Sequence, residues 1–184
     1  MRREDLHRLA RRVYPYVAEE YFLHWTEAEV PGVVDELLED LFNHGLLTAS
    51  EDRAIWRRPA AESPEAVQLS VLAQATVPIL ERYYLALALL LKAGSGRLTP
   101  EALERQCELM AQRMAMLYEI NSPEFFDRAL FRNFVERLRA RGVLSLTEDE
   151  KLGFDPAVLE AVLADAQAVL HEQMRNSILQ VVHR

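Results

Sequence analysis

The clearest pattern of apolar and polar positions lies between Gln68 and Lys92. Residues suited to one buried helix face recur there every three or four positions: Leu69, Leu72, Thr76, Leu80, Tyr83, Leu87 and Leu91. From Leu85 to Leu91 the segment is apolar on every side, so it must be covered all round. The pattern predicts a central core helix. Pro78 should bend or break it near Val77, because proline lacks an N–H and its ring clashes with the preceding turn.

A membrane-spanning helix is the alternative explanation of this apolar run. Spanning a bilayer takes about 20 consecutive apolar residues. Glu81, Arg82 and Lys92 interrupt the run and leave a stretch that is too short. We therefore expect a buried core helix and no transmembrane segment.

A first helix is predicted from Arg2 to Trp25, with an interruption at Pro15. Its apolar face is formed by Leu6, Leu9, Val13, Tyr16 and Val17. The other side carries five arginines, Arg2, Arg3, Arg8, Arg11 and Arg12. Such a cationic face is typical of a solvated helix surface, and contact with an anionic surface is the sharper alternative.

A second helix and a hairpin follow. Thr26 and Glu29 have capping-box spacing, in which each side chain satisfies the other's free backbone N–H. The helix then runs through PGVVDELLEDLFNH and ends at Gly45, the residue type that best tolerates a left-handed closing turn. The next segment, LLTASEDRAIWRRP, is typical of two short strands joined by a polar turn at Ser50-Glu51-Asp52.

The later helices share a start signal, a Ser, Thr or Asp followed by proline. The side-chain oxygen caps the first turn, and proline is favoured next because the N–H it lacks would be unpaired there anyway. The signal predicts helices over residues 64–92, 100–119, 123–141 and 156–182, opened by Ser63-Pro64, Thr99-Pro100, Ser122-Pro123 and Asp155-Pro156. Gly94-Ser95-Gly96 is a flexible link between them.

The chain contains two copies of one pattern, related by a shift of 97 residues that places Gly45 on Gly142. Without a gap, the same shift aligns Val34 with Phe131, Leu37 with Phe134, Leu41 with Leu138, Leu47 with Leu144, Glu51 with Glu148, Asp52 with Asp149, Ile55 with Leu152 and Pro59 with Pro156. Each copy has a helix, a glycine stop, a short hairpin and a proline-started helix, which is the order of a winged-helix unit. Two unrelated helices that end in similar turns are an equal alternative.

These patterns predict a mainly α fold with two short β-hairpins. The halves would be residues 1–97, which include the core helix, and residues 98–184; together they would make one domain. If the two copies of the pattern are a true repeat, the halves form a tandem winged-helix-like repeat.

The charge of the chain argues against nucleic acid as a partner. Its 184 residues carry a net charge of −8, whereas phosphate binding relies on a basic surface. The helix of the first copy presents Asp35, Glu36, Glu39 and Asp40, which would repel phosphates.

The corresponding helix of the second copy is cationic, through Arg128, Arg132, Arg137, Arg139 and Arg141. Arg128, Arg132 and Arg139 are spaced four and seven apart, so they share one side of a helix. Phe131, Phe134, Val135 and Leu138 would occupy the inward side. This arginine face suits an acidic protein or an anionic membrane surface, and simple pairing with glutamates such as Glu124 and Glu136 is the alternative.

The sequence predicts no catalytic, cofactor-binding or metal-binding residue. No two of its five histidines are three or four apart, and His171-Glu172 opens like a zinc-protease motif but continues to Arg175 instead of a second histidine. Glycine-rich phosphate loops and nucleophile elbows are absent from the sequence. Cys107 is the one cysteine, which excludes a disulfide framework and favours a reducing compartment.

Several segments resemble the C-terminal region of the bacterial membrane-associated glycerol-3-phosphate 1-acyltransferases, the PlsB family. They are YPYVAEEYFLHW, PGVVDELLEDLFNHGLL, ILERYYLALALLL, and the stretch from Leu103 to Leu144 with AQR at Ala111 to Arg113 and INSPEFFD at Ile120 to Asp127. The matches keep their order over almost the whole chain. The resemblance implies an enzyme that moves a fatty acyl group from acyl-carrier protein or coenzyme A to the 1-hydroxyl of glycerol 3-phosphate. The product would be lysophosphatidic acid, an intermediate of phospholipid synthesis, made at the cytoplasmic face of the inner membrane.

The family's catalytic motif is a histidine followed five residues later by an aspartate, a base and the group that orients it. In this chain the residues five after the histidines are Arg12, Glu29, Ala49 and Asn176, and none follows His183 at that distance. Of these pairs, His24 and Glu29 are the most similar to the histidine–aspartate motif. No catalytic residue of the family can therefore be placed on this sequence, and a C-terminal domain of a longer enzyme is expected.

Two functional hypotheses follow. The first is a structural or regulatory domain of a peripheral acyltransferase, packed against a catalytic domain of the same enzyme. Its arginine face, Arg128, Arg132 and Arg139, would then meet acyl-carrier protein or the anionic inner-membrane surface. The second is a stand-alone winged-helix-like module that binds an acidic partner.

Overall fold

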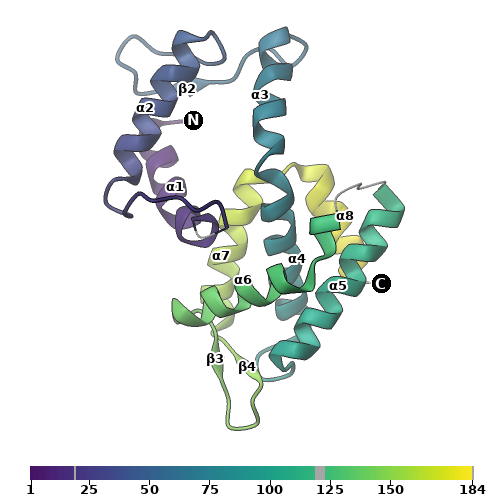
Figure 1. The fold of residues 1–184 in the computed structure, drawn as a ribbon. Helices are drawn as coiled ribbons and strands as arrows, with labels where there is room; N and C mark the ends of the chain where they lie inside the picture. The colour runs from purple at the N-terminus through teal and green to yellow at the C-terminus, as the bar shows by residue number, and fades with distance from the viewer. Residues whose placement is uncertain (19, 119–122, 184) are drawn as a thin grey trace. The chain divides into compact units, whose positions relative to one another are not determined.

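The computed structural model describes residues 1–18, 20–118 and 123–183. Within these ranges the chain forms eight α-helices, one 3-10 helix and two antiparallel sheets of two strands each. They make up two compact units, residues 1–76 and residues 77–184 (Figure 1). The predicted mainly α fold with two short hairpins is confirmed.

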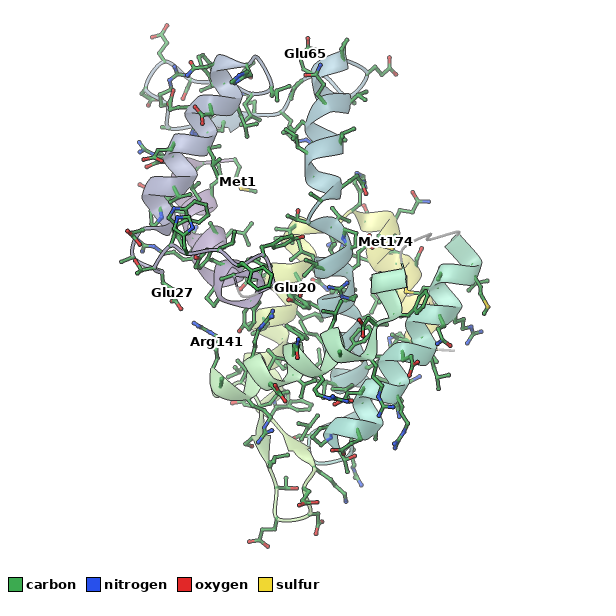
Figure 2. All side chains as sticks on the ribbon, in the orientation of Figure 1. Met1, Glu20, Glu27, Glu65, Arg141 and Met174 are labelled. Carbon is green, nitrogen blue, oxygen red and sulfur yellow. The ribbon has the colours of Figure 1, made fainter. Side chains whose placement is uncertain are left out.

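Unit 1 contains, in chain order, α1 (Arg3–Val17), α2 (Val30–Asn43), β1 (Thr48–Ala49), β2 (Trp56–Arg57) and α3 (Pro64–Gln74). Helices α1 and α2 pack against each other. The core of the unit is formed by buried Leu38, Leu47 and Trp56, with Leu6, Val34, Leu41, Phe42, Ala49 and Leu69 partly buried around them. Helix α3 starts at the predicted cap, where Ser63 Oγ accepts a hydrogen bond from Ala66 N–H at 3.1 Å, and Glu65 lies in its first turn (Figure 2).

The helix ends in unit 1 follow the local signals in part. Gly45 closes α2 with φ 73°, as predicted. One half of the predicted capping box forms: the Glu29 carboxylate accepts hydrogen bonds from Thr26 N–H and from Thr26 Oγ1–H, both at 2.7 Å. The predicted interruption at Pro15 is wrong: α1 continues through Pro15 to Val17. Proline removes one hydrogen bond and its ring crowds the preceding turn, but α1 keeps its helical form and ends two residues later.

Unit 2 contains α4 (Val77–Ala93), α5 (Pro100–Tyr118), the 3-10 helix η1 (Pro123–Phe126), α6 (Arg128–Ala140), β3 (Ser145–Leu146), β4 (Leu152–Gly153), α7 (Pro156–Val169) and α8 (Glu172–His183). Helix α4 packs against α5, α6, α7 and α8 and is the centre of the unit (Figure 1). Every residue from Glu81 to Leu90 is buried. The prediction of a central core helix is therefore confirmed for α4.

The segment before α4 does not share this burial. The helical pattern breaks between Gln74 and Val77, as Pro78 predicted, and residues 70–76 are exposed. Leu72 and Thr76, which the periodicity placed on the buried face, lie in this exposed part. That part of the prediction is wrong because helical spacing identifies a shared face but not whether another element covers it.

Two of the later predicted helices are divided. The α-helix expected from Pro123 starts at Arg128, because Asp127 is extended and its Oδ1 accepts from Ala129 N–H at 2.8 Å. The helix expected over residues 156–182 breaks where Leu170 becomes extended, with φ −92° and ψ 147°. The predicted Ser122 cap and the predicted end at residue 119 lie outside the described residues. The caps at Thr99 and Asp155 form as expected.

The two copies of the sequence pattern have the same order of elements. Helix α5 begins 97 residues after α1, α6 ends 97 residues after α2, and β3 lies 97 residues after β1. In each copy the segment before the first helix bonds to the second hairpin strand: Trp56 N–H donates to Met1 O at 2.9 Å, and Leu152 N–H donates to Leu98 O at 2.7 Å. These contacts support the tandem winged-helix-like alternative. The division into residues 1–97 and 98–184 follows this repeat and stays a prediction.

Candidate functional site

The arginine face predicted from the sequence lies on α6. Phe131, Phe134, Val135 and Leu138 are all buried, which confirms the predicted inward side of this helix. Arg132 and Arg139 are exposed and Arg128 is half-buried, so the three arginines lie on the opposite, outer side.

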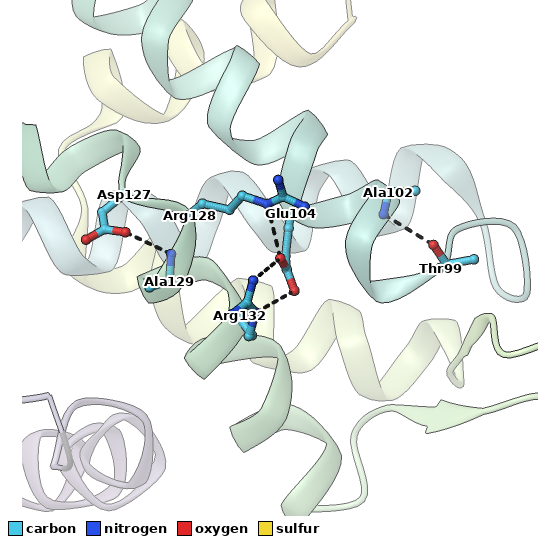
Figure 3. Close-up of polar contacts among 7 residues, drawn as sticks. All are labelled: Thr99, Ala102, Glu104, Asp127, Arg128, Ala129 and Arg132. Carbon is cyan, nitrogen blue, oxygen red and sulfur yellow. Dashed lines mark hydrogen bonds and ion pairs between the residues drawn. The ribbon is translucent and has the colours of Figure 1, made fainter.

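Two of these arginines bind a carboxylate of the neighbouring helix (Figure 3). Arg128 Nε donates to Glu104 Oε2 at 3.2 Å, and Arg132 donates through Nε to Oε1 and through Nη2 to Oε2, each at 3.2 Å. The Glu104 side chain is only 4% exposed. A buried carboxylate requires charged partners, because burial alone removes its hydration. The hydrogen bond and charge of Glu104 raise the pKa of Arg132 above its ordinary value.

Arg139 differs from the other two, because its side chain makes no hydrogen bond or ion pair with the described residues. It lines a pocket of about 290 Å³ together with Arg132. The pocket lies between the N-terminal turns of α5, the outer side of α6 and the β3–β4 hairpin. Four carboxylates also line it, those of Glu101, Glu104, Glu136 and Glu150. The pocket therefore mixes both signs of charge and is not uniformly basic.

Arg137 does not belong to this face. Its side chain is buried, and its Nη1 donates to Tyr83 Oη of α4 at 2.7 Å. The Tyr83 ring stacks on Phe134 with centroids 3.9 Å apart. The sequence reasoning missed this role, although Arg137 lies three residues after inward-facing Phe134, which is the spacing of a shared helix face.

The arginines of α1 are partly engaged as well. Arg3 Nε donates to Asp35 Oδ1 of α2 at 2.6 Å, and His7 Nε2 lies 2.7 Å from the same oxygen. The hydrogen bond from Arg3 lowers the pKa of Asp35 more than its partial burial raises it. Arg8 forms an ion pair with Asp5 on the same helix. For these residues the solvated, locally paired alternative fits better than contact with an anionic surface.

The geometry gives no support for chemistry at His24 or Cys107. The His24 ring lies against Trp25, with centroids 4.6 Å apart, while the Glu29 carboxylate accepts both hydrogen bonds from Thr26. Cys107 is fully buried, and burial together with the charge of Glu104 raises the pKa of its thiol. A thiol with a raised pKa is a poor nucleophile at neutral pH.

No group of three or more His, Cys, Asp or Glu residues among the described residues could hold a metal ion. None of the helices in residues 1–18, 20–118 and 123–183 is long and apolar enough to cross a membrane.

The chain is similar to a known family. The model of the family described as "Glycerol-3-phosphate acyltransferase C-terminal region" matches residues 1–147. The glycerol-3-phosphate acyltransferase of Pseudomonas entomophila (strain L48) is 41% identical over 185 residues, and that of Pseudomonas aeruginosa (strain UCBPP-PA14) is 42% identical over 179 residues. These alignments cover 100% and 97% of this chain but only 22% and 21% of the relatives. No solved structure matches the chain.

Proposed function

The chain belongs to the family of glycerol-3-phosphate acyltransferase C-terminal regions, and we propose that it serves as a non-catalytic part of a longer enzyme of this kind. One observation carries the proposal: glycerol-3-phosphate acyltransferases match the chain over all or nearly all of its length, while the chain spans about a fifth of theirs. The larger remainder of such an enzyme would hold the reaction centre.

The proposed reaction is transfer of a fatty acyl group from acyl-carrier protein or coenzyme A to the 1-hydroxyl of sn-glycerol 3-phosphate. It gives lysophosphatidic acid, which feeds phospholipid synthesis. A general base must deprotonate the hydroxyl, and a carboxylate must orient that base. The sequence of this chain has no histidine followed five residues later by an aspartate, so both groups would come from the rest of the enzyme.

The role proposed for this chain is structural or regulatory. Its well-packed α4 core and its buried Glu104, to which Arg132 donates hydrogen bonds, are features of a stable scaffold, which would pack against the catalytic domain. We place the enzyme at the cytoplasmic side of the bacterial inner membrane, bound peripherally. The arginine face would contact acyl-carrier protein or the anionic membrane surface, chiefly through Arg139, because Arg128 and Arg132 are held by Glu104.

An acyl-transfer assay on the 184-residue chain and on the longer enzyme tests this function. We expect turnover of glycerol 3-phosphate by the longer enzyme, none by the 184-residue chain, and loss of turnover when the longer enzyme lacks these residues. Turnover by the 184-residue chain that disappears in His24→Ala would overturn the non-catalytic role.

The stand-alone interaction module is the second candidate, and the matching order of elements in the two copies favours it. The gene sequence separates the two candidates. A reading frame that continues far upstream of Met1 and encodes a His-x-x-x-x-Asp motif supports the acyltransferase. A stop codon directly upstream of Met1 supports the module.

A further inference from the structure

Helix α3 exposes apolar side chains to solvent. Val67, Val71 and Leu72 are 60%, 66% and 56% exposed, while Ala66 is the buried residue of this helix. The one charged residue of α3 is Glu65, at its N-terminal end (Figure 2). From Ala66 to Leu80 the sequence has no charged residue. The helix thus lacks the charged outer face that a solvated surface helix normally carries.

Val67 and Val71 form the outer side of α3. Ala66 is buried, and Leu69, three residues later, packs against the buried cluster of unit 1. Val67 and Val71 are one helical turn apart on the opposite side, and Leu72 lies at the flank, one turn after Leu69. Single exposed apolar residues are ordinary on protein surfaces, but several on one uncharged helix mark an interaction surface.

A further exposed apolar side chain, that of Phe22, follows in sequence a residue that bonds to the C-terminal end of α3. Tyr21 Oη donates to Ala75 O at 2.5 Å, so the segment that carries Tyr21 is bonded to the residue that caps α3. The next residue, Phe22, is 91% exposed and has φ 53°. A left-handed backbone conformation is unfavourable for a bulky residue. The chain therefore holds an aromatic ring in water on a strained backbone, next to a residue bound to α3.

We propose that the outer side of α3, with Phe22, is the surface on which the catalytic part of the same longer enzyme docks. This inference rests on the proposed function. The relatives carry about four fifths of their length outside the aligned region, so a large covalently linked partner is at hand. The surface is uncharged and apolar, which suits a permanent interface, because obligate interfaces are the more hydrophobic class. An acidic carrier protein or an anionic bilayer would instead require arginines or lysines, which α3 lacks.

Cysteine accessibility tests this surface independently of turnover. Val71→Cys is compared with Glu51→Cys, an exposed position in the turn of the first hairpin. The only native cysteine of this chain, Cys107, is fully buried. Maleimide labelling is followed by mass spectrometry of the two peptides, so that cysteines elsewhere in the longer enzyme do not contribute.

In the 184-residue chain we expect both positions to react at similar rates. In the longer enzyme we expect position 71 to react at least about tenfold more slowly than position 51, since labelling then requires opening of the covered surface. Equal rates in the longer enzyme overturn the proposal. Slow labelling of position 71 in the 184-residue chain also overturns the proposal. If the labelling is slow at every protein concentration, another part of the same chain covers the surface. If it slows as the concentration rises, a second copy of the chain covers it.

A charge substitution gives a second test. Val71→Asp places a carboxylate in the proposed interface, and Val71→Thr keeps nearly the same shape without charge. In the 184-residue chain both variants should unfold at the same midpoint as the wild type, because the site is solvated. In the longer enzyme, protease cleavage between the two parts should be faster for Val71→Asp than for Val71→Thr. Equal cleavage would contradict the proposal, even where the enzyme retains its acyl-transfer activity.

Discussion

Arg132 of α6 donates two parallel hydrogen bonds to Glu104 of α5, from Nε to Oε1 and from Nη2 to Oε2, both at 3.2 Å. The repeat shift of 97 residues places His7 on Glu104 and Asp35 on Arg132. His7 Nε2 and Asp35 Oδ1 lie 2.7 Å apart in unit 1. Equivalent positions of the two copies thus link equivalent helices, with the acidic partner on the second helix in one copy and on the first helix in the other. This correspondence supports a common origin of the two copies.

The Glu104 cluster makes a first prediction. Replacing both Arg128 and Arg132 with alanine leaves the Glu104 carboxylate buried without a charged partner. The double variant should lose about 3–5 kcal/mol of unfolding free energy in urea titrations, the usual cost of breaking a buried ion pair. Adding Glu104→Met should restore much of the loss, because a similar volume of apolar side chain needs no partner. Arg139→Ala is the control and should stay within about 0.5 kcal/mol of wild type; a double variant as stable as this control contradicts the prediction.

The second prediction concerns the buried hydroxyl of Tyr83. In Tyr83→Phe the Arg137 guanidinium loses an acceptor in the interior, so the unfolding free energy should fall by about 1.5–3 kcal/mol, as for hydrogen bonds to charged groups. Tyr84→Phe is the matched control, since Tyr84 Oη accepts from the neutral Gln167 amide at 3.3 Å. Its loss should be about 0.5–1.5 kcal/mol. An equal loss in both variants would mean that the charge of Arg137 has no special weight.

Glu81 should make stability depend on pH. Burial raises the pKa of this carboxyl in the folded chain to about 7, from an ordinary value near 4.5. The folded state then binds more protons than the unfolded state between these values, so the stability contribution is complete below pH 4.5 and is lost as pH rises toward 7.

In Glu81→Gln this loss should disappear. The variant should be more stable than wild type at pH 8, by about 1–3 kcal/mol, and should match it at pH 4. Urea unfolding at the two pH values measures the difference, with exposed Glu148→Gln as the control. A wild-type stability that is unaffected by Glu81→Gln at pH 8 would show that the carboxyl ionises without cost.

The centre of unit 2 makes a fourth prediction. Leu87 and Leu90 are each 1% exposed in α4, so truncation to alanine should leave cavities and cost about 2–5 kcal/mol of unfolding free energy per site. Leu109→Ala, at an exposed position of α5, should cost far less. Thermal and urea unfolding of the three variants compares them directly. Similar midpoints for all three would place α4 outside the core.

The fifth prediction concerns the proposed contact of the arginine face with an anionic partner. Arg139→Ala should weaken co-sedimentation with anionic vesicles at low salt by about fivefold, since a basic residue near such a surface contributes about 1 kcal/mol. The difference should vanish at high salt and with neutral vesicles, because salt screens the attraction. Arg57→Ala, in β2, is the control. Equal binding of wild type, Arg139→Ala and the triple Arg128→Ala, Arg132→Ala, Arg139→Ala variant would exclude the membrane, and titration with acyl-carrier protein would then test the other anionic partner.

Local sequence signals determined the start and end of most elements. Ser63, Thr99 and Asp155 cap helices where a side-chain oxygen precedes proline, and Gly45 and Gly142 stop helices with φ 73° and 71°. The inward side of α6 and the central place of α4 also follow from the spacing of apolar residues. Such features depend on atoms within a few residues of one another, so the sequence alone contains them.

Tertiary structure decided which side chains meet. The break at Leu170 has no glycine or proline beside it, and this leucine is buried in an extended conformation that ends α7. Arg137 points inward to Tyr83, and the buried Glu104 accepts from two arginines that the sequence placed on the outer side of a helix. Glu104 and Arg137 are each hydrogen-bonded to a partner more than 20 residues away along the chain, and a buried charge needs such partners. Helical spacing does not identify such a partner, so the outer side of α6 could be predicted from the sequence, but the charges that surround it could not.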